Sequence, residues 1–302
     1  MNVAIEQFLR SLEARNFSVH TLRAYQKTLG EFSRHLGNMP VRKLDRQHVR
    51  GFMRYLGERG LVKKSLQREL GAVRSFAKWL HVEGLVTADI ARGIMTPKFP
   101  THLPDLPSQM EVRTLLDGQP TTPFPERDRA LLELLYATGI RVAEVCDIKL
   151  EDFEEPDVVI VRGKGKRVRR VIYGERAKAA LDAYLPVRQK MLDGRTLTDL
   201  LPRNALFLSF GTNIGLQGLN VRSVGRILKD VAAAKGLDPN KFHPHALRRC
   251  FATHLHDNGC PIEVVYKLLG HTNLSTTVIY TQVSTTRMIQ SYNAAHPHAR
   301  SA

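Results

Sequence analysis

A proline-rich stretch about a third of the way along the chain restricts the possible folds more than any other feature. Residues 96–108 read TPKFPTHLPDLPS, with four prolines in thirteen residues. Because proline fixes φ and has no amide hydrogen, no helix continues through this stretch. We expect an extended, semi-rigid linker over 98–108. The 302 residues then form two domains, 1–97 and 109–302, and each is long enough to bury its own core.

The segment before the linker has the apolar spacing of helices. Apolar residues recur at steps of three and four over 18–36, 45–60 and 66–80, and a first helix is expected over about 3–14. Asp45 stands where an N-cap is needed. The first domain is therefore predicted to be small and all-helical.

The chain is strongly basic, and the predicted helical domain holds a large share of the excess. Lys and Arg total 45 against 29 Asp and Glu, and residues 1–97 contain 17 basic residues against 8 acidic ones. Such an excess is typical of proteins that bind a polyanion, either a nucleic-acid backbone or an anionic lipid surface. A solvated basic face is the alternative, but few acidic residues interleave to form i,i+4 pairs. We therefore favour phosphate contacts by Arg42, Lys43, Arg46, Lys63, Lys64, Arg68 and Arg74.

The segment after the linker combines helices with a small sheet. Apolar residues over 131–136 predict a buried helix, and residues 158–161 and 168–173 read as two strands joined by residues 163–167. The predicted fold is therefore mainly α, of the α+β class, with an all-helical first domain and a mostly helical second domain that holds a small antiparallel sheet. No apolar run approaches the ~18 residues that a membrane span needs. Three cysteines without paired spacing, and a start without a secretory signal, favour the reducing cytoplasm.

Two short motifs in the second domain place arginines where an anion could bind. Thr138 to Glu144 is predicted to begin a helix, with Thr138 as the cap and Arg141 in the first turn, where a cation is unfavourable for the helix dipole. Arg141 therefore either has a role beyond helix stability or pairs with Glu144 at i,i+3, and the motif alone leaves both open. His245 and Arg248 follow a proline and lie about 60° apart on one helix, where they could grip an anion. A structural hydrogen bond is the alternative for the histidine.

Histidines and cysteines gather over 243–260, but their spacing does not favour a metal site. No Cys-x-x-Cys or His-Glu-x-x-His motif is present, and His254 and His256 point about 200° apart on a helix. The sequence has no glycine-rich loop of the Walker or dinucleotide type either. Gly270 is predicted to end a helix. Spacing alone does not mark Tyr280 as more reactive than the other tyrosines.

These motifs, in this order, resemble those of the tyrosine recombinases (the phage integrase family), especially of the Xer type. They are Thr138-Gly-Ile-Arg141, Gly163-Lys164-Gly165, His245-Ala-Leu-Arg248, Leu268-Leu-Gly-His271 and Tyr280. The resemblance covers nearly the whole chain and implies a DNA-binding core-binding domain, a linker and a catalytic domain. It also implies site-specific recombination of duplex DNA through a 3′-phosphotyrosyl intermediate, without a metal or other cofactor.

The resemblance further implies a role for each residue of the site. The implied catalytic residues are, in chain order, Arg141, Lys164, His245, Arg248, His271 and Tyr280. The arginines bind the scissile phosphate, the lysine protonates the leaving 5′-oxygen, and the tyrosine is the nucleophile. Lys166, Arg167 and Arg169 are implied to contact the DNA backbone, although physical reasoning alone does not choose between Lys164 and Lys166 as the catalytic lysine. Tyr292 is the second candidate for the nucleophile.

The Xer resemblance also implies particular partners. The chain would join a second, related recombinase in a tetrameric synapse on chromosomal sites, resolve chromosome dimers, and act with a septal DNA translocase. A phage or mobile-element integrase is the close alternative, and a DNA-binding module without catalysis is the alternative from another class. Arg249-Cys250 stands where Xer proteins more often have His-Ser, and Gln282 where a His is common, but neither departure falls on a catalytic position.

Overall fold

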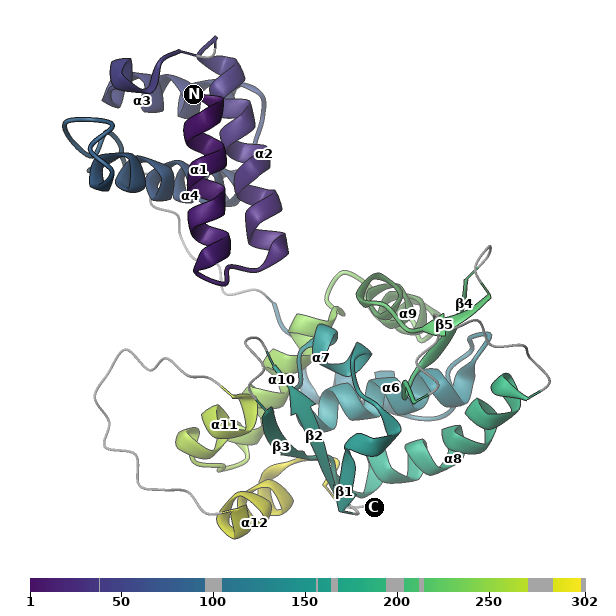
Figure 1. Ribbon diagram of the computed structural model, residues 1–302. Helices are drawn as coiled ribbons and strands as arrows, with labels where there is room; N and C mark the ends of the chain where they lie inside the picture. Colours follow the sequence, from purple (N-terminus) through teal and green to yellow (C-terminus); the bar gives the residue numbers. More distant parts are fainter. Residues whose placement is uncertain are drawn as a thin grey trace. The chain divides into compact units, whose positions relative to one another are not determined.

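The computed structural model describes the chain over residues 1–37, 39–95, 105–155, 157–163, 168–193, 204–211, 215–270 and 285–299. The chain divides into two compact units, Met1–His102 and Leu103–Ala302, and each is described by itself (Figure 1). No helix within the described ranges is long and apolar enough to cross a membrane.

The first unit is a helical bundle. Its described residues form a short 3₁₀ turn, η1 (Val41–Lys43), and the helices α1 (Asn2–Ala14), α2 (Val19–His35), α3 (Arg46–Glu58) and α4 (Lys63–Val82). The Asp45 side chain accepts a hydrogen bond from a backbone N–H three residues on, which confirms it as the N-cap of α3. The core is aromatic: the ring centroids of Phe8 and Phe76 lie 5.4 Å apart, and those of Phe32 and Phe52 lie 5.0 Å apart. The all-helical fold predicted for this part is confirmed.

The second unit is mostly helical. Its described residues form a 3₁₀ turn, η2 (Leu150–Asp152), and the helices α5 (Gln109–Leu116), α6 (Pro125–Thr138), α7 (Val142–Cys146), α8 (Gly174–Leu192), α9 (Val221–Ala234), α10 (Pro244–Asp257), α11 (Ile262–Leu269) and α12 (Thr285–Ala295). Helix α6 is buried on every side from Ala130 onward and packs against both α8 and α10. This agrees with the buried helix predicted over 131–136, because a helix apolar all round must lie inside the fold.

Two antiparallel sheets complete the second unit. The first has the order β1 (Phe153–Glu155), β2 (Val158–Arg162) and β3 (Val168–Ile172), and its register pairs Arg162 with Val168. The small antiparallel sheet predicted from the sequence is therefore confirmed. The second sheet, β4 (Leu208–Gly211) with β5 (Gly215–Gly218), was not predicted. Its strands are short and have glycines at their ends, so they lack the apolar alternation that marks a strand.

Candidate active site

Arg248 is a buried arginine held between the ends of two helices. It lies on α10, whose N-cap His243 accepts a hydrogen bond from the Ala246 N–H (3.1 Å), and its side chain is 7% exposed. Its Nη1 donates to the carbonyl oxygen of Gly139, the C-cap of α6, and its Nη2 donates to that of Leu269, the last residue of α11 (2.7 Å). Carbonyl groups at helix C-termini carry partial negative charge, so this position favours a cation. The guanidinium is therefore fixed in place before any substrate arrives.

The charge of Arg248 is only partly compensated by its surroundings. Burial lowers the pKa of the guanidinium, and the positive charge of Arg141 and that of Arg169 lower it further, to about 10, although Glu144 opposes this effect. Arg141 therefore lies within electrostatic range of Arg248 even though the two residues come from different helices. A site that gathers arginines in this way favours an anion between them.

Arg141 is placed by the turn between α6 and α7, and here the sequence prediction was wrong in detail. Thr138 does not cap α7. It is the last residue of α6, and its hydroxyl donates a hydrogen bond to the Leu134 carbonyl in the same helix. Gly139 then takes the left-handed conformation (φ 57°) and ends the helix, so Arg141 becomes the N-cap of α7 and does not lie in its first turn. The orphan backbone N–H of Arg141 is satisfied by the Glu144 carboxylate, at 2.7 Å.

Both roles considered for Arg141 are compatible with its position. Its guanidinium pairs with Glu144 at i,i+3, with Nη1 2.9 Å from Oε1. Its side chain nevertheless stays 48% exposed, whereas that of Glu144 is 5% exposed. The arginine therefore keeps donors that can reach a phosphate while the carboxylate orients it from behind.

Glu144 is the buried acidic centre of the site, and the sequence indicated it only as a partner for Arg141. Burial raises the pKa of its carboxyl, but hydrogen bonds from Arg169 and from the Arg141 backbone outweigh burial and lower the pKa to about 2. Arg169, on β3, makes a two-point contact with it: Nη1 lies 2.9 Å from Oε1, and Nη2 lies 2.7 Å from Oε2. The Arg169 side chain is only 16% exposed. Both terminal nitrogens of Arg169 therefore bind Glu144, and the DNA-backbone contact expected for Arg169 stays a prediction.

Arg169 and its neighbour Arg170 lie on opposite faces of β3. Successive residues of a strand face opposite sides, so Arg169 shares a face with Val171, which is fully buried, and Arg170 faces the other way. Arg170 is 58% exposed and pairs with Glu154 on the neighbouring strand.

His245 lies three residues before Arg248 on α10 but in a different environment. The His245 side chain is exposed, whereas that of Arg248 is buried. The ring of His245 lies nearly parallel to that of His243, with centroids 6.4 Å apart. Of the six residues predicted to be catalytic, the structure describes three, which are Arg141, His245 and Arg248.

The remaining predicted residues of the catalytic unit lie outside the described residues: Lys164, Lys166, Arg167, His271 and Tyr280. Their neighbours in the chain are described. Gly270 ends α11 in the left-handed conformation (φ 66°), which confirms the predicted C-cap directly before residue 271.

Tyr292, the second candidate for the nucleophile, lies in a core. Its side chain is 0% exposed, its hydroxyl has no hydrogen-bond partner within the described residues, and its ring stacks on His296 with centroids 4.8 Å apart. Burial raises the pKa of this phenol well above its ordinary value. A phenol so placed can neither reach a DNA strand nor ionise readily, so Tyr292 is excluded as the nucleophile in this structure.

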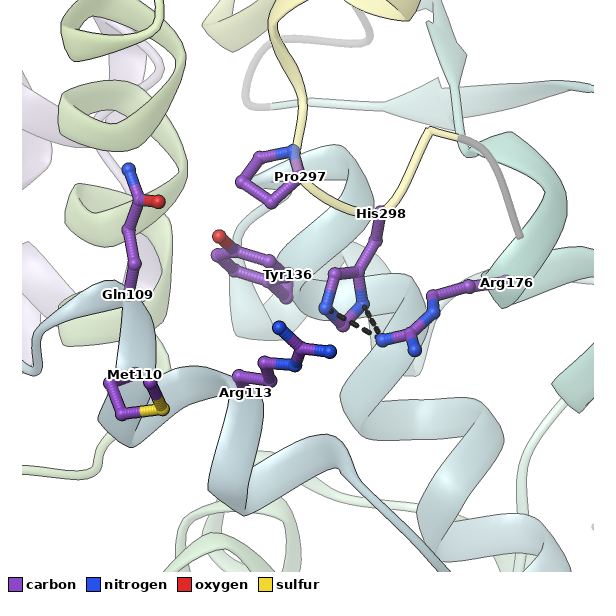
Figure 2. Close-up of a pocket in the computed structure, with 7 residues that line it drawn as sticks. All are labelled: Gln109, Met110, Arg113, Tyr136, Arg176, Pro297 and His298. Carbon is purple, nitrogen blue, oxygen red and sulfur yellow. Dashed lines mark hydrogen bonds between the residues drawn. The ribbon is translucent and has the colours of Figure 1, made fainter. Parts of the chain in front are cut away.

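The C-terminal segment that holds Tyr292 also borders a cavity of about 310 Å³ (Figure 2). His298 fixes the segment: its Nδ1 donates to the buried Glu133 carboxylate at 2.8 Å, and its Nε2 accepts from Arg176 at 3.0 Å. The cavity is lined by Gln109, Met110, Arg113, Tyr136, Arg176, Pro297 and His298. None of the residues predicted for catalysis or DNA contact lines it, so it is a seam between the C-terminal segment and helices α5, α6 and α8.

In the part of the chain that the structure describes, no three His, Cys, Asp or Glu side chains are placed to hold a metal ion. Members of the 243–260 cluster have other partners: the His254 ring bonds the Tyr136 hydroxyl (3.0 Å), and the Cys250 thiol donates to the Pro107 carbonyl (3.3 Å).

The basic residues predicted to contact DNA in the first unit are all exposed. Six of them lie in η1 or in the first turns of α3 and α4, and Arg74 lies near the middle of α4. Arg68 pairs with Glu69 at 2.9 Å, and Arg74 donates to the Ile94 carbonyl.

Comparison with known proteins defines the class. Residues 108–287 match the model of the phage integrase family, and residues 5–84 match that of the phage integrase N-terminal SAM-like domain. A crystal structure of a lambda integrase dimer bound to a COC′ core site is similar to this chain with a TM-score of 0.68 and 17% identity, over 94% of this chain and 99% of that one. The chain belongs to the phage integrase family, whose members are tyrosine recombinases that break and rejoin DNA.

Among curated relatives, the similarity extends over almost the whole chain. The tyrosine recombinase XerC of Thermodesulfovibrio yellowstonii is 36% identical over 97% of this chain and 96% of its own length. The tyrosine recombinase XerD of Vibrio cholerae is 35% identical over 98% of this chain and 96% of its own length.

Proposed function

We propose that this chain is a site-specific recombinase that joins Tyr280 to the 3′ side of a scissile DNA phosphate. The observation that carries the proposal is the charge of the described site: Arg141 and Arg169 bond one carboxylate, Glu144, and Arg248 lies within electrostatic range of all three. Three positive charges and one negative charge leave a net charge of +2 in a partly buried site, which is complementary to a phosphodiester approaching a doubly charged transition state.

The two arginines proposed to bind the phosphate, Arg141 and Arg248, favour the transition state over the ground state. Attack on a phosphodiester turns a single negative charge on the nonbridging oxygens into nearly two. Arg248, held by two helix-end carbonyls, does not have to reorganise to meet that charge. Arg141, oriented by Glu144, supplies a second guanidinium. Their attraction for the phosphate therefore strengthens as the reaction proceeds, which is the requirement for catalysis.

The proton transfers fall to the residues matched to the family motifs. A phenol has a pKa near 10, so the Tyr280 hydroxyl must pass its proton to a base, one of the matched histidines His245 or His271, as its oxygen bonds to phosphorus. The bond from phosphorus to the 5′-oxygen breaks, and Lys164 donates a proton to that oxygen. A 5′-hydroxyl of a second duplex then attacks the phosphotyrosine and releases the phenol, so the phosphodiester is conserved. His245 and His271 complete the set, and no metal or nucleotide is needed.

The two parts of the chain divide the work in this proposal. Residues 1–97 bind the DNA backbone through their basic residues, 98–108 form the linker, and 109–302 carry catalysis. Lys166 and Arg167 add backbone contacts in the catalytic part. The exposure of the basic side chains at η1 and at the starts of α3 and α4 supports this assignment.

We further propose a Xer role in the cytoplasm. The chain would resolve chromosome dimers in a tetrameric synapse with a second Xer-type recombinase, under the control of a septal DNA translocase. The support is the similarity to Xer proteins over almost the whole chain. Identities of 36% to a XerC and 35% to a XerD do not choose between those two roles. The C-terminal tail, Ala295-His-Pro-His-Ala-Arg300, resembles the tail of Xer proteins and favours XerC.

A nicked suicide substrate tests the proposal. The full-length chain is incubated with a duplex that carries the host's candidate chromosomal site and a nick near the cleavage point, with and without the second recombinase. We expect a covalent adduct that is lost in Tyr280→Phe and retained in Tyr292→Phe. Tight binding without any adduct would leave only a DNA-binding module, and an adduct that survives Tyr280→Phe would refute the choice of nucleophile.

A further inference from the structure

Arg169 lies where three segments of the candidate active site meet. Its guanidinium bonds both oxygens of Glu144, which in turn orients Arg141 at the start of α7. It stands on β3, one residue after the strand's first residue, and the connection from β2 to β3 carries Lys164.

The third segment is the end of α11. A Cβ built on Gly270 would lie 2.8 Å from Cδ of Arg169 and 3.1 Å from its Nε, so the glycine backbone packs directly on the arginine stem. That Nε is buried and has no hydrogen-bond partner within the described residues. Gly270 directly precedes His271 in the chain. The residue before Gly270 is Leu269, whose carbonyl accepts a hydrogen bond from Arg248. One side chain thus bonds to the helix that begins at Arg141 and packs against the helix end whose carbonyl holds Arg248.

The charge of Arg169 matters as much as its position. Without it, the full negative charge of Glu144 would fall on Arg141, which lies 2.9 Å away, and the net charge of the group would drop from +2 to +1. A carboxylate that is not otherwise neutralised competes with the scissile phosphate for the same guanidinium. With Arg169 bound to both carboxylate oxygens, Glu144 can orient Arg141 without consuming its charge.

We propose that Arg169 is a positioning residue of the cleavage reaction: it neutralises Glu144, and so frees Arg141 for the phosphate, while it fixes the backbone at Gly270. This inference rests on the proposed function, because it presupposes a phosphate between Arg141 and Arg248. Arg169 touches neither the phosphate nor the reacting atoms in this proposal.

The neighbouring residue supplies a matched control. Arg170 is on the same strand and also pairs with one carboxylate, that of Glu154, but it is 58% exposed and faces the other side of the strand. Arg170→Gln therefore reports the effect of losing one arginine charge and an exposed ion pair from the same strand, whereas damage to the site should appear only at Arg169.

The test measures the single-turnover rate of adduct formation on the nicked duplex at saturating full-length protein. The variants compared are Arg169→Gln, Arg169→Lys, Arg170→Gln, Glu144→Gln and the double variant Glu144→Gln/Arg169→Gln. We expect Arg169→Gln to slow adduct formation about 30-fold or more with DNA affinity within about twofold of the parent. Arg170→Gln should stay within about twofold. Arg169→Lys should recover only part of the rate, since an ammonium cannot bind both carboxylate oxygens at fixed geometry.

The double variant separates electrostatic positioning from mere folding. It restores the net charge of +2 and keeps an amide oxygen to accept from the Arg141 N–H, so it should be at least about fivefold faster than Arg169→Gln alone. A double variant as slow as, or slower than, Arg169→Gln would overturn the proposal, as would equally slow adduct formation in Arg169→Gln and Arg170→Gln. Loss of the adduct in Tyr280→Phe reports separately on the proposed function, whatever the Arg169 variants do.

Discussion

Gly139 offers a quantitative test of how the site is built, because it is both a helix end and a support for Arg248. It adopts φ +57°, and a Cβ there would lie 2.4 Å from Cδ1 of Phe251, whose side chain is 1% exposed. An alanine in the left-handed region costs about 1–2 kcal/mol. Forcing a buried ring to move costs a further ~1–3 kcal/mol. Gly139→Ala should therefore destabilise the catalytic unit by about 2–5 kcal/mol.

Gly236 is the matched control for this substitution. It also has a positive φ, +71°, but nothing lies within 4 Å of the Cβ that alanine would add. Gly236→Ala should therefore cost only the backbone contribution of about 1–2 kcal/mol. At roughly 2–4 °C per kcal/mol for a unit of this size, Gly139→Ala should melt roughly 2–12 °C below the control.

Thermal unfolding of the full chain, followed by far-ultraviolet circular dichroism, measures the difference. Trp79, the only tryptophan, lies in α4 of the first unit, so its fluorescence provides an internal reference that should not change. Adduct formation should also fall more in Gly139→Ala than in Gly236→Ala, because the Gly139 carbonyl that holds Arg248 would shift with the ring. Equal melting temperatures for the two variants would refute the packing derived for Gly139.

Four further predictions follow from the site and the basic surface. Arg248→Lys should slow single-turnover adduct formation about 10²–10³-fold while DNA affinity measured by fluorescence anisotropy changes little, since one transition-state donor is removed. The ion pairs of Glu144 lower the pKa of its carboxyl to about 2 in the folded state, against roughly 4.3 in the unfolded state. They therefore stabilise the fold by about 3 kcal/mol above about pH 5, and this stabilisation is lost as the pH falls towards 2. The loss of stability with falling pH, followed by circular dichroism, should be shallower in Glu144→Gln. Tyr292→Phe should melt at or above the temperature of the parent, because it removes a buried hydroxyl that has no hydrogen-bond partner among the described residues. Replacing Lys63 and Lys64 by Gln should weaken DNA binding and lower the slope of log K against log salt by about one for each phosphate that the side chains no longer neutralise.

The parts of the fold that the sequence predicted are those with strong local signals. Helices with a clear apolar stripe, the Asp45 cap and the glycine that ends α11 all depend on neighbours in the chain, so spacing is enough to place them. The turn at Thr138 was misplaced because a threonine can cap a helix or bond back within one, and only the burial of α6 decides between these roles. The hairpin of β4 and β5 has no periodic apolar pattern that would mark it.

The site was predictable only in part, because some of its contacts join residues that are far apart in the chain. Arg141 and Arg248 stand in motifs whose spacing is informative, but the contact between Glu144 and Arg169 joins residues 25 positions apart on different elements. Nothing local to either residue indicates that contact. The burial of Tyr292, which removes it as a rival to Tyr280, is likewise a property of packing between α12 and α10.

The grip of Arg248 on the Gly139 and Leu269 carbonyls bears on how activity is judged in relatives of this chain. A guanidinium that ties two helix ends together is retained by selection for folding even when selection for recombination has ceased. A descendant that drifts into inactivity still needs this arginine for its fold, whereas the role proposed for Tyr280 is in the reaction. Among such chains, the presence of the arginine is therefore a weak sign of a working enzyme, and the residue at position 280 is the better indicator.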